Sequence, residues 1–173
     1  MRTRLFVGIA AVSVVLDQVT KILVRQQILL GERGQTVIQG LFDIVHVENS
    51  GAAFGLLAGY DWAIWVFVPF TLIAVIVLIS LLRECNPAAR FMPAALGLIL
   101  GGALGNFVDR VWKQSVTDFL RVYQDTGPLY DWLVANFGTA EYPSFNVADM
   151  SICLGVAMFV IHELTWGRKK RED

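Results

Sequence analysis

The sequence predicts an all-α membrane protein with four transmembrane helices, a small extracytoplasmic β element and an interfacial helix. Of its 173 residues, 55% are hydrophobic and only 17% are charged, and the mean hydropathy is +0.57. Soluble domains carry more charge than this. The apolar residues also gather into four stretches of about 20 residues, the length that crosses a bilayer as a helix. We therefore expect one integral membrane domain over residues 1–173.

The four expected spans are residues 5–24, 62–82, 92–111 and 144–165. The second and third contain long runs without any charge, and the fourth contains only Asp149 before its last turn. The first follows two arginines and could be mistaken for a cleaved signal peptide. However, Asp17 and Lys21 follow its apolar run, and three more spans come later, so we expect it to be retained.

The distribution of charge predicts the orientation. Four spans place both termini and the loop at 83–91 on one side, which carries eight basic and four acidic residues, including a basic cluster at 168–171. The other side carries six basic and eleven acidic residues. Basic residues favour the cytoplasmic side of a membrane, so both termini should be cytoplasmic. Nothing in the charge pattern indicates a nucleic-acid partner.

Two elements are expected outside the membrane. Residues 35–48 are rich in β-forming residues around Gly40 and predict a strand or hairpin, followed by a loop over 48–55. The aromatic-rich link 121–142 predicts a short helix, capped by Asp125 or Thr126 and ended by Gly138. Aromatic side chains at this level favour an element that lies in the membrane interface.

Small residues recur at every fourth position of the third span, at Gly97, Gly101 and Gly105. This pattern is typical of close helix packing and does not form a phosphate-binding loop. Close packing would place the polar residues that follow, Asn106, Asp109 and Arg110, against neighbouring helices.

Polar residues from separate parts of the chain are predicted to share one depth, at the outer end of the bundle. A carboxylate near hydrocarbon costs a few kcal/mol or more, so each is a candidate functional residue. The residues concerned are Asp17, Lys21, Asn49, Asn106, Asp109, Arg110, Asp118, Asn146 and Asp149. Two converging carboxylates, Asp118 and Asp149, could share a proton and activate water.

Each of these residues also has a structural interpretation. Asp17 and Lys21 are four residues apart on a helix and can form an ion pair that anchors the first span, or they can contact substrate. Arg110 can reach toward the interface or position a carboxylate. Asp109 and Arg110 point to different helical faces and should have different partners. The two histidines and two cysteines show no metal-binding spacing, so we expect no metal and no cofactor.

Five blocks of sequence resemble the motifs of the lipoprotein signal peptidases, the bacterial type II signal peptidases. They occur in order across essentially the whole chain and centre on Asp17–Lys21, Asn49–Phe54, Gly101–Arg110, Val116–Phe119 and Phe145–Asp149. Compared with better-known members, the link 121–142 looks longer.

The resemblance implies an inner-membrane aspartic endopeptidase that removes signal peptides from diacylglyceryl-modified prolipoproteins, cutting before the lipidated cysteine. Carried over by motif, Asp118 and Asp149 form the catalytic dyad. The other matched positions around the active site are Asp17, Lys21, Asn49, Gly51, Gly105, Asn106, Arg110, Asn146 and Ala148. The expected partners are these prolipoproteins and membrane lipid, and we expect a monomer.

Two other classes of protein fit the residues without the resemblance. A small proton-coupled transporter could use the same carboxylates as a relay, although the polar residues gather at one face and do not line a path across the membrane. An assembly protein could use the polar groups only to join helices.

Overall fold

The computed structural model describes residues 1–32, 34–51 and 64–167. Its elements in chain order are α1 (Arg2–Gln27), β1 (Gln35–Ile38), β2 (Phe42–Asn49), α2 (Ile64–Glu84), α3 (Phe91–Lys113), β3 (Val116–Val122), α4 (Pro128–Phe137), α5 (Val147–His162) and a terminal π-helical turn (Glu163–Gly167). Four of the described helices, α1, α2, α3 and α5, are long and apolar enough to cross a membrane. The predicted fold class is therefore confirmed. The start of the predicted second span, the loop from 52 to 55 and the basic cluster 168–171 lie outside the described residues.

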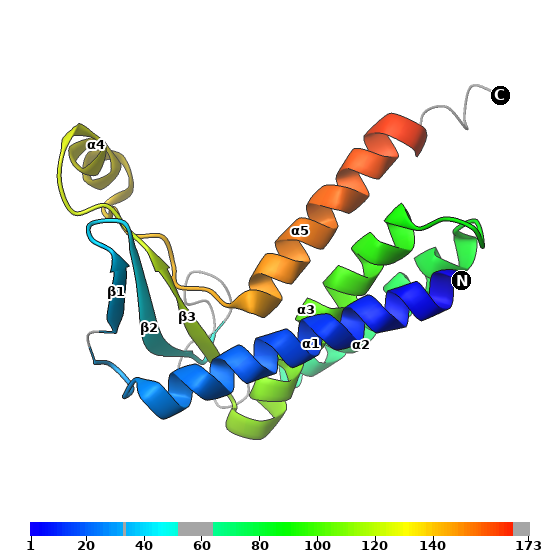
Figure 1. Cartoon of the computed structure of the whole chain (residues 1–173), viewed down its shortest axis with the longest axis horizontal. Helices are drawn as coiled ribbons and strands as arrows, with labels where there is room; N and C mark the ends of the chain where they lie inside the picture. The colour runs from blue at the N-terminus through cyan, green and yellow to red at the C-terminus, as the bar shows by residue number, and fades with distance from the viewer. Residues whose placement is uncertain (33, 52–63, 168–173) are drawn as a thin grey trace.

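The spanning helices surround α3. This helix has the most extensive contacts with α5 and α1 and also packs on α2, whereas α1 and α5 contact each other over a short stretch. An apolar core joins the first three spans, from Phe6 and Ala10 through Leu78 to Leu96. The start of α1, the α2–α3 connection and the end of α5 lie at one end of the bundle, and the strands and α4 lie at the other (Figure 1).

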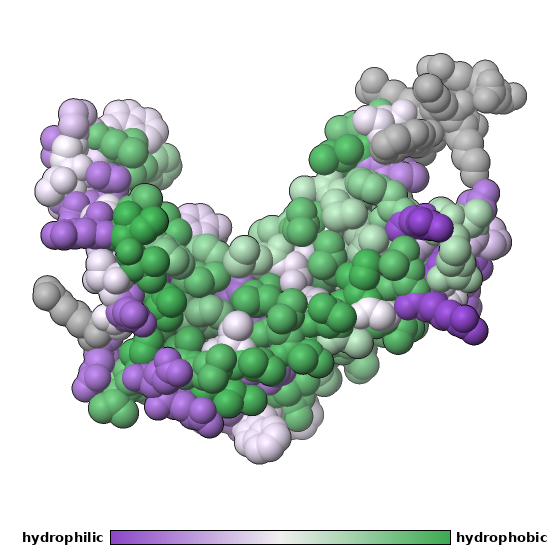
Figure 2. All heavy atoms as spheres, in the orientation of Figure 1, coloured by the Kyte–Doolittle hydropathy of each residue, from purple (hydrophilic) through white to green (hydrophobic). Residues whose placement is uncertain are grey.

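Most of the apolar surface of these helices faces outward, as expected for helices in lipid. Figure 2 shows hydrophobic residues over the middle of the molecule and hydrophilic residues gathered at its two ends. Large apolar side chains such as Val15, Phe70 and Ile76 are more than half exposed. Outside a bilayer such a surface would favour aggregation, so the fold itself supports residence in a membrane.

Glycines let α3 approach both of its main neighbours. A Cβ on Gly97 would lie 2.7 Å from the backbone oxygen of Phe6, and one on Gly101 would lie 2.5 Å from the Cβ of Ser13. On the opposite face, a Cβ on Gly102 would lie 2.3 Å from the backbone oxygen of Ala148. The predicted role of these small residues in close helix packing is confirmed.

The β element is a three-stranded antiparallel sheet in the order β1-β2-β3. The hairpin β1–β2 turns at Gly40, whose φ of +75° suits glycine, as predicted. The third strand was not predicted. Its β-branched sequence, Val-Thr-Asp-Phe-Leu-Arg-Val, follows α3 after two residues, and Asp118 had been assigned only to the outer end of the third span.

Two predicted boundaries need correction. The fourth span begins at Val147 and not at 144, because residue 145 pairs with Leu120 of β3 and Asn146 has an extended backbone and caps the helix. Helix α4 ends at Gly138 as predicted, but its N-cap is Gly127, with a φ of +91° that suits glycine. No side chain caps the helix, so neither Asp125 nor Thr126 has the predicted role.

Candidate active site

The two candidate aspartates lie in one cleft, where the strands meet the ends of α3 and α5. Asp118 points from the middle of β3, and Asp149 occupies the first turn of α5. The cleft measures about 240 Å³ and is also lined by Asn49, Asn106, Arg110, Val116 and the segment 142–145. Residues separated by up to a hundred positions thus converge on one polar cavity.

Asn146 connects the two aspartates. Its side-chain nitrogen donates to Oδ1 of Asp118 at 2.7 Å, and its side-chain oxygen accepts from the backbone N–H of Asp149 at 3.0 Å. In return, Oδ2 of Asp149 accepts from the backbone N–H of Asn146 at 3.1 Å. This reciprocal pair is a capping box. The same residues that start α5 therefore fix the relative position of both carboxylates.

Asp118 is almost fully buried and is held by neutral donors. Asn49 donates to its Oδ2 at 3.0 Å, opposite the bond from Asn146 to its Oδ1. Burial raises the pKa of Asp118 to about 6, and the nearby negative charge of Asp149 adds to this effect, while the bonds from the two asparagines oppose it. Asp118 is therefore able to hold a proton near neutral pH.

Asp149 has a different environment. It is half-buried, and its Oδ1 accepts from the side chain of Asn106 at 2.8 Å. Its position in the first turn of α5 places it at the positive end of the helix dipole. The two carboxylates therefore differ in their exposure and in the groups that contact them.

A buried ion-pair cluster lies directly beneath the dyad. Lys21 is fully buried and contacts Asp17 at 2.8 Å, Asp109 at 3.2 Å and the side-chain oxygen of Asn106 at 2.9 Å. Because Asn106 also donates to Asp149, Lys21 acts on the dyad through one neutral amide. The predicted ion pair between Asp17 and Lys21 is thus present, in the interior of the bundle.

Asp17 links the cluster to α5. Its Oδ1 accepts from the backbone N–H of Ala148 at 2.9 Å. A Cβ on Gly105 would lie 2.6 Å from Oδ2 of Asp17 and 3.3 Å from the Cβ of Ala148. Both positions therefore require small residues, which explains why a glycine and an alanine stand here.

Arg110 and Asp109 have different partners, as predicted. Arg110 donates to the backbone oxygen of Gly51 at 3.4 Å, and its guanidinium lies 4.2 Å from the ring centroid of Phe67. Asp109 instead accepts from Lys21 and from the backbone N–H of Thr117 at 3.1 Å. Five of the eleven residues selected from the sequence line the cleft, three are hydrogen-bonded to lining residues, and Asp17, Gly105 and Ala148 pack together in the layer beneath.

Several residues of this layer were missed from the sequence. Thr117 is fully buried between Asp109 and Glu48, and its hydroxyl accepts from Arg25 and Lys113. Arg25 could have been found, because it continues the four-residue spacing from Asp17 to Lys21. Glu48 had no such signal.

Glu48 ties the sheet to the end of α3. It accepts from Lys113, from Ser115 at 2.6 Å, from Thr117 at 2.9 Å and from His46 at 3.1 Å. Burial on its own would raise the pKa of Glu48, but these hydrogen bonds outweigh it and lower the pKa to about 2. Glu48 therefore stays charged and holds β2 and β3 in register beside the dyad.

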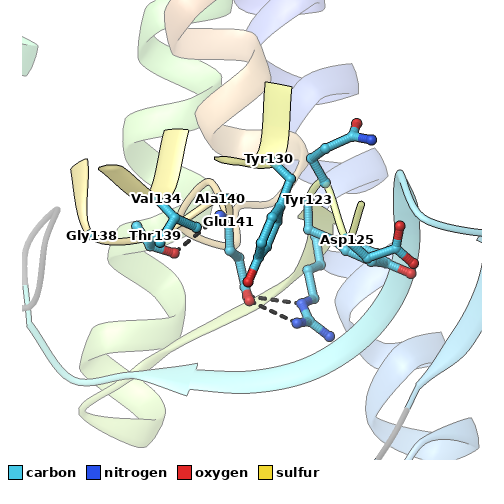
Figure 3. A pocket seen from close by; sticks show the side chains of 10 residues that line it. Tyr123, Asp125, Tyr130, Val134, Gly138, Thr139, Ala140 and Glu141 are labelled. Carbon is cyan, nitrogen blue, oxygen red and sulfur yellow. Dashed lines mark hydrogen bonds and ion pairs between the residues drawn. The ribbon is translucent and has the colours of Figure 1, made fainter. Parts of the chain in front are cut away.

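A second cavity, about 470 Å³, lies between β3 and α4 and is separate from the dyad (Figure 3). Arg121 and Glu141 form a bidentate ion pair in its wall, at 2.7 and 2.8 Å, with Tyr130 alongside (Figure 3). None of the eleven selected residues lines this cavity, so it belongs to the sheet and the link and not to the candidate active site.

The fold and the cleft together define a class: a multi-pass membrane enzyme whose polar site lies at one end of an apolar bundle. Two solved structures described as bacterial membrane enzymes share this fold, with TM-scores of 0.77 and 0.73 and 33% identity each. They cover 97% and 93% of this chain and 92% and 93% of their own chains.

The sequence comparison identifies the particular family. The sequence model of signal peptidase (SPase) II matches residues 9–165. The chain is 43% identical to the lipoprotein signal peptidase of Maridesulfovibrio salexigens, covering 88% of this chain and 90% of that one. It is 38% identical to the lipoprotein signal peptidase of Bacillus pumilus, over 95% and 96% of the two chains. The chain belongs to the signal peptidase II family and is therefore a protease, which removes the basis for a transporter or an assembly protein.

Proposed function

We propose that the chain is an aspartic endopeptidase that removes the signal peptide from diacylglyceryl-modified prolipoproteins. The observation that carries this proposal is the convergence of Asp118 and Asp149 on one cleft, both hydrogen-bonded to Asn146. Family membership supports the substrate class. We further propose that the cut falls immediately before the lipidated cysteine.

The different surroundings of the two carboxylates suggest their roles. Asp149, at the start of α5, is the ionised partner and takes a proton from the attacking water. Asp118, whose pKa is raised to about 6, holds a proton and donates a hydrogen bond to the scissile carbonyl oxygen as negative charge develops there. Two close carboxylates titrate as a coupled pair, so one shared proton suits both roles.

The asparagines position the dyad in this proposal. Asn49, Asn106 and Asn146 are all neutral, so they orient the carboxylates without forcing both to be ionised. Arg110, held by Gly51 and stacked on Phe67, reaches the cleft and positions the substrate backbone.

The charge distribution supports an orientation with both termini in the cytoplasm. The cleft then lies near the outer face of the bacterial inner membrane, where a translocated prolipoprotein presents its cleavage site. The diacylglyceryl chains enter sideways from the outer leaflet, and the enzyme works as a monomer.

Single substitutions of the dyad test the proposal. Asp118→Asn and Asp149→Asn should each lower processing of a purified diacylglyceryl prolipoprotein by about 10²- to 10⁴-fold, because each removes one partner in proton transfer. Insertion of both variants into membranes should be unchanged. Asp131→Asn, an exposed position in α4, is the matched control and should retain full activity.

Mass spectrometry of the products locates the cut. Full activity of either dyad variant would refute the aspartic mechanism. Cleavage at another bond by the wild-type protein would refute the proposed cut site and leave the dyad intact. Chelators should not reduce activity, and a loss with EDTA that zinc restores would refute a dyad that acts without metal.

A further inference from the structure

A groove separate from the active-site cleft runs along α1, from near its start to the level of Ser151. Its volume is about 380 Å³, and it is lined by α1 residues from Arg4 to Leu16, by Leu98 of α3 and by Ser151 of α5. Helices α1 and α5 lie together near Ser13 and Ser151 and diverge toward the end of the bundle that carries the start of α1 (Figure 1). The groove lies on this diverging side.

The lining of the groove is apolar along almost all of its length. Val12 and Leu16 are more than half exposed, and a Cβ on Gly8 would meet no atom within 4 Å. The two serines at its floor satisfy each other, since Ser13 donates to Ser151 at 2.8 Å and Ser151 donates to the backbone oxygen of Val147 at 2.9 Å. The floor therefore offers no unpaired polar group to water.

The length of the groove matches one leaflet of a bilayer. From Arg4 to Leu16, α1 rises about 18 Å, and half of the hydrocarbon core measures about 15 Å. Because these residues belong to a spanning helix, the groove is filled in the membrane by hydrocarbon and not by water. An extended acyl chain fits these dimensions.

The charge at the open end selects the ligand. Arg4 is exposed at the end of the groove, and no described acidic side chain forms an ion pair with it. A guanidinium at this level binds phosphate well. The signal peptide of a substrate fits less well, because its basic n-region would face Arg4. A helix of the same length would also occupy about 1,400 Å³, well above the groove volume.

We propose that this groove is a binding site for an anionic phospholipid, with one acyl chain along α1 and the phosphate on Arg4. The site is separate from the dyad and does not depend on the proposed reaction. Bound lipid would occupy the diverging space between α1 and α5 and support the packing that starts at Ser13 and Ser151.

Lipid titration of the purified full chain tests the proposal. Native mass spectrometry would measure binding of phosphatidylglycerol and of phosphatidylcholine with identical acyl chains. The wild-type protein should prefer phosphatidylglycerol, and Arg4→Gln should weaken phosphatidylglycerol binding by about fivefold. Arg83→Gln removes a charge at the same end of the bundle, on α2 and away from the groove, and should leave binding unchanged.

A second pair of variants tests the groove itself. A Cβ on Gly8 would meet no atom within 4 Å, so Gly8→Leu should fold, and its side chain should enter the groove and weaken binding of both lipids. Ala11→Leu adds the same side chain on an exposed part of α1 that does not line the groove. Equal effects of Gly8→Leu and Ala11→Leu, or no headgroup preference in the wild type, would mean non-specific surrounding lipid only and would overturn the proposal.

A photoreactive residue at Val12 identifies the occupant in native membranes. Crosslinking to phospholipid is the expected result. Crosslinking mainly to a signal peptide, or to a second copy of the chain, would assign the groove to that occupant and overturn the lipid site.

Discussion

The proton on Asp118 should make the stability of the protein depend on pH in a defined direction. Burial raises its pKa from the ordinary 3.8 to about 6. A carboxyl with a raised folded-state pKa contributes its full stabilisation below pH 3.8 and loses it as pH rises through 6. A rise of the pKa from 3.8 to about 6 corresponds to about 3 kcal/mol, of which roughly half should be lost between pH 5 and pH 8.

The assay compares the wild-type chain with Asp118→Asn. Equilibrium unfolding in mixed micelles at pH 5, 6, 7 and 8 would give the free energy of unfolding of each protein. The asparagine cannot titrate, so the difference between the two proteins should change by about 1–2 kcal/mol across this range, with the wild type losing stability as pH rises. Any constant cost of the changed hydrogen bonds with Asn49 and Asn146 cancels in that comparison.

Coupling to Asp149 needs its own control. The same comparison in an Asp149→Asn background removes the negative neighbour but leaves the burial, which is the largest cause of the shift. The pH dependence should therefore persist at reduced size. Parallel stability curves for the wild type and Asp118→Asn between pH 5 and pH 8 would refute a protonated Asp118, and with it the proposed role of this residue as hydrogen-bond donor.

Three further predictions concern the support of the site. Lys21→Met should destabilise the protein by about 3–5 kcal/mol, because it leaves the buried Asp17 without a cation and weakens the pairing of Asp109. Lys21→Arg should not restore the packing. Unfolding in micelles measures both variants, and unchanged stability of Lys21→Met would argue against the cluster. Gly102→Val should separate α3 from α5 at Ala148 and prevent stable folding, whereas Gly8→Ala should be tolerated. Thermal unfolding distinguishes the two variants, and equal stability would contradict the close approach of α3 to α5. Gln114→Gly should stabilise the protein by up to about 1 kcal/mol, because residue 114 ends α3 with a φ of 61°, a left-handed conformation that favours glycine. A lower melting temperature of this variant would show that the contacts of the Gln114 side chain outweigh the backbone strain.

Much of the fold could be predicted because membrane helices follow from composition. Uncharged runs of about 20 residues have few alternatives in a bilayer, and the glycine spacing on the third span indicated the close packing that Gly97, Gly101 and Gly102 permit. Boundaries were harder to predict. The fourth span appeared to start at 144, since apolar composition alone cannot distinguish a residue that pairs with a strand from the first turn of a helix.

The polar layer was predicted in outline but not in its connections. Topology placed Asp17, Asn106 and Asp149 at one depth, which the structure bears out by bringing them into one hydrogen-bonded cluster. The third strand could not be recognised, because seven residues between a span and a polar link give a weak pattern. Without that strand, the burial of Thr117 and its contact with Glu48 had no basis in the sequence.

The separation of charged and neutral partners within this layer explains how the dyad can retain a proton. The acids of this layer that are not proposed to be catalytic bind the cations. Asp17 and Asp109 share Lys21, and the half-buried Glu48 binds Lys113. Among the described basic side chains, none forms an ion pair with Asp118 or Asp149.

Neutral amides make the contacts to the dyad instead. A cation placed directly on either aspartate would favour ionisation of both and remove the shared proton that the proposed mechanism requires. Replacing Asn106 with a lysine should therefore abolish processing even if the protein folds, whereas Asn106→Gln should retain part of the activity. Measuring cleavage and unfolding on the same two preparations separates this electrostatic effect from a loss of structure, and substantial activity of a folded Asn106→Lys variant would refute it.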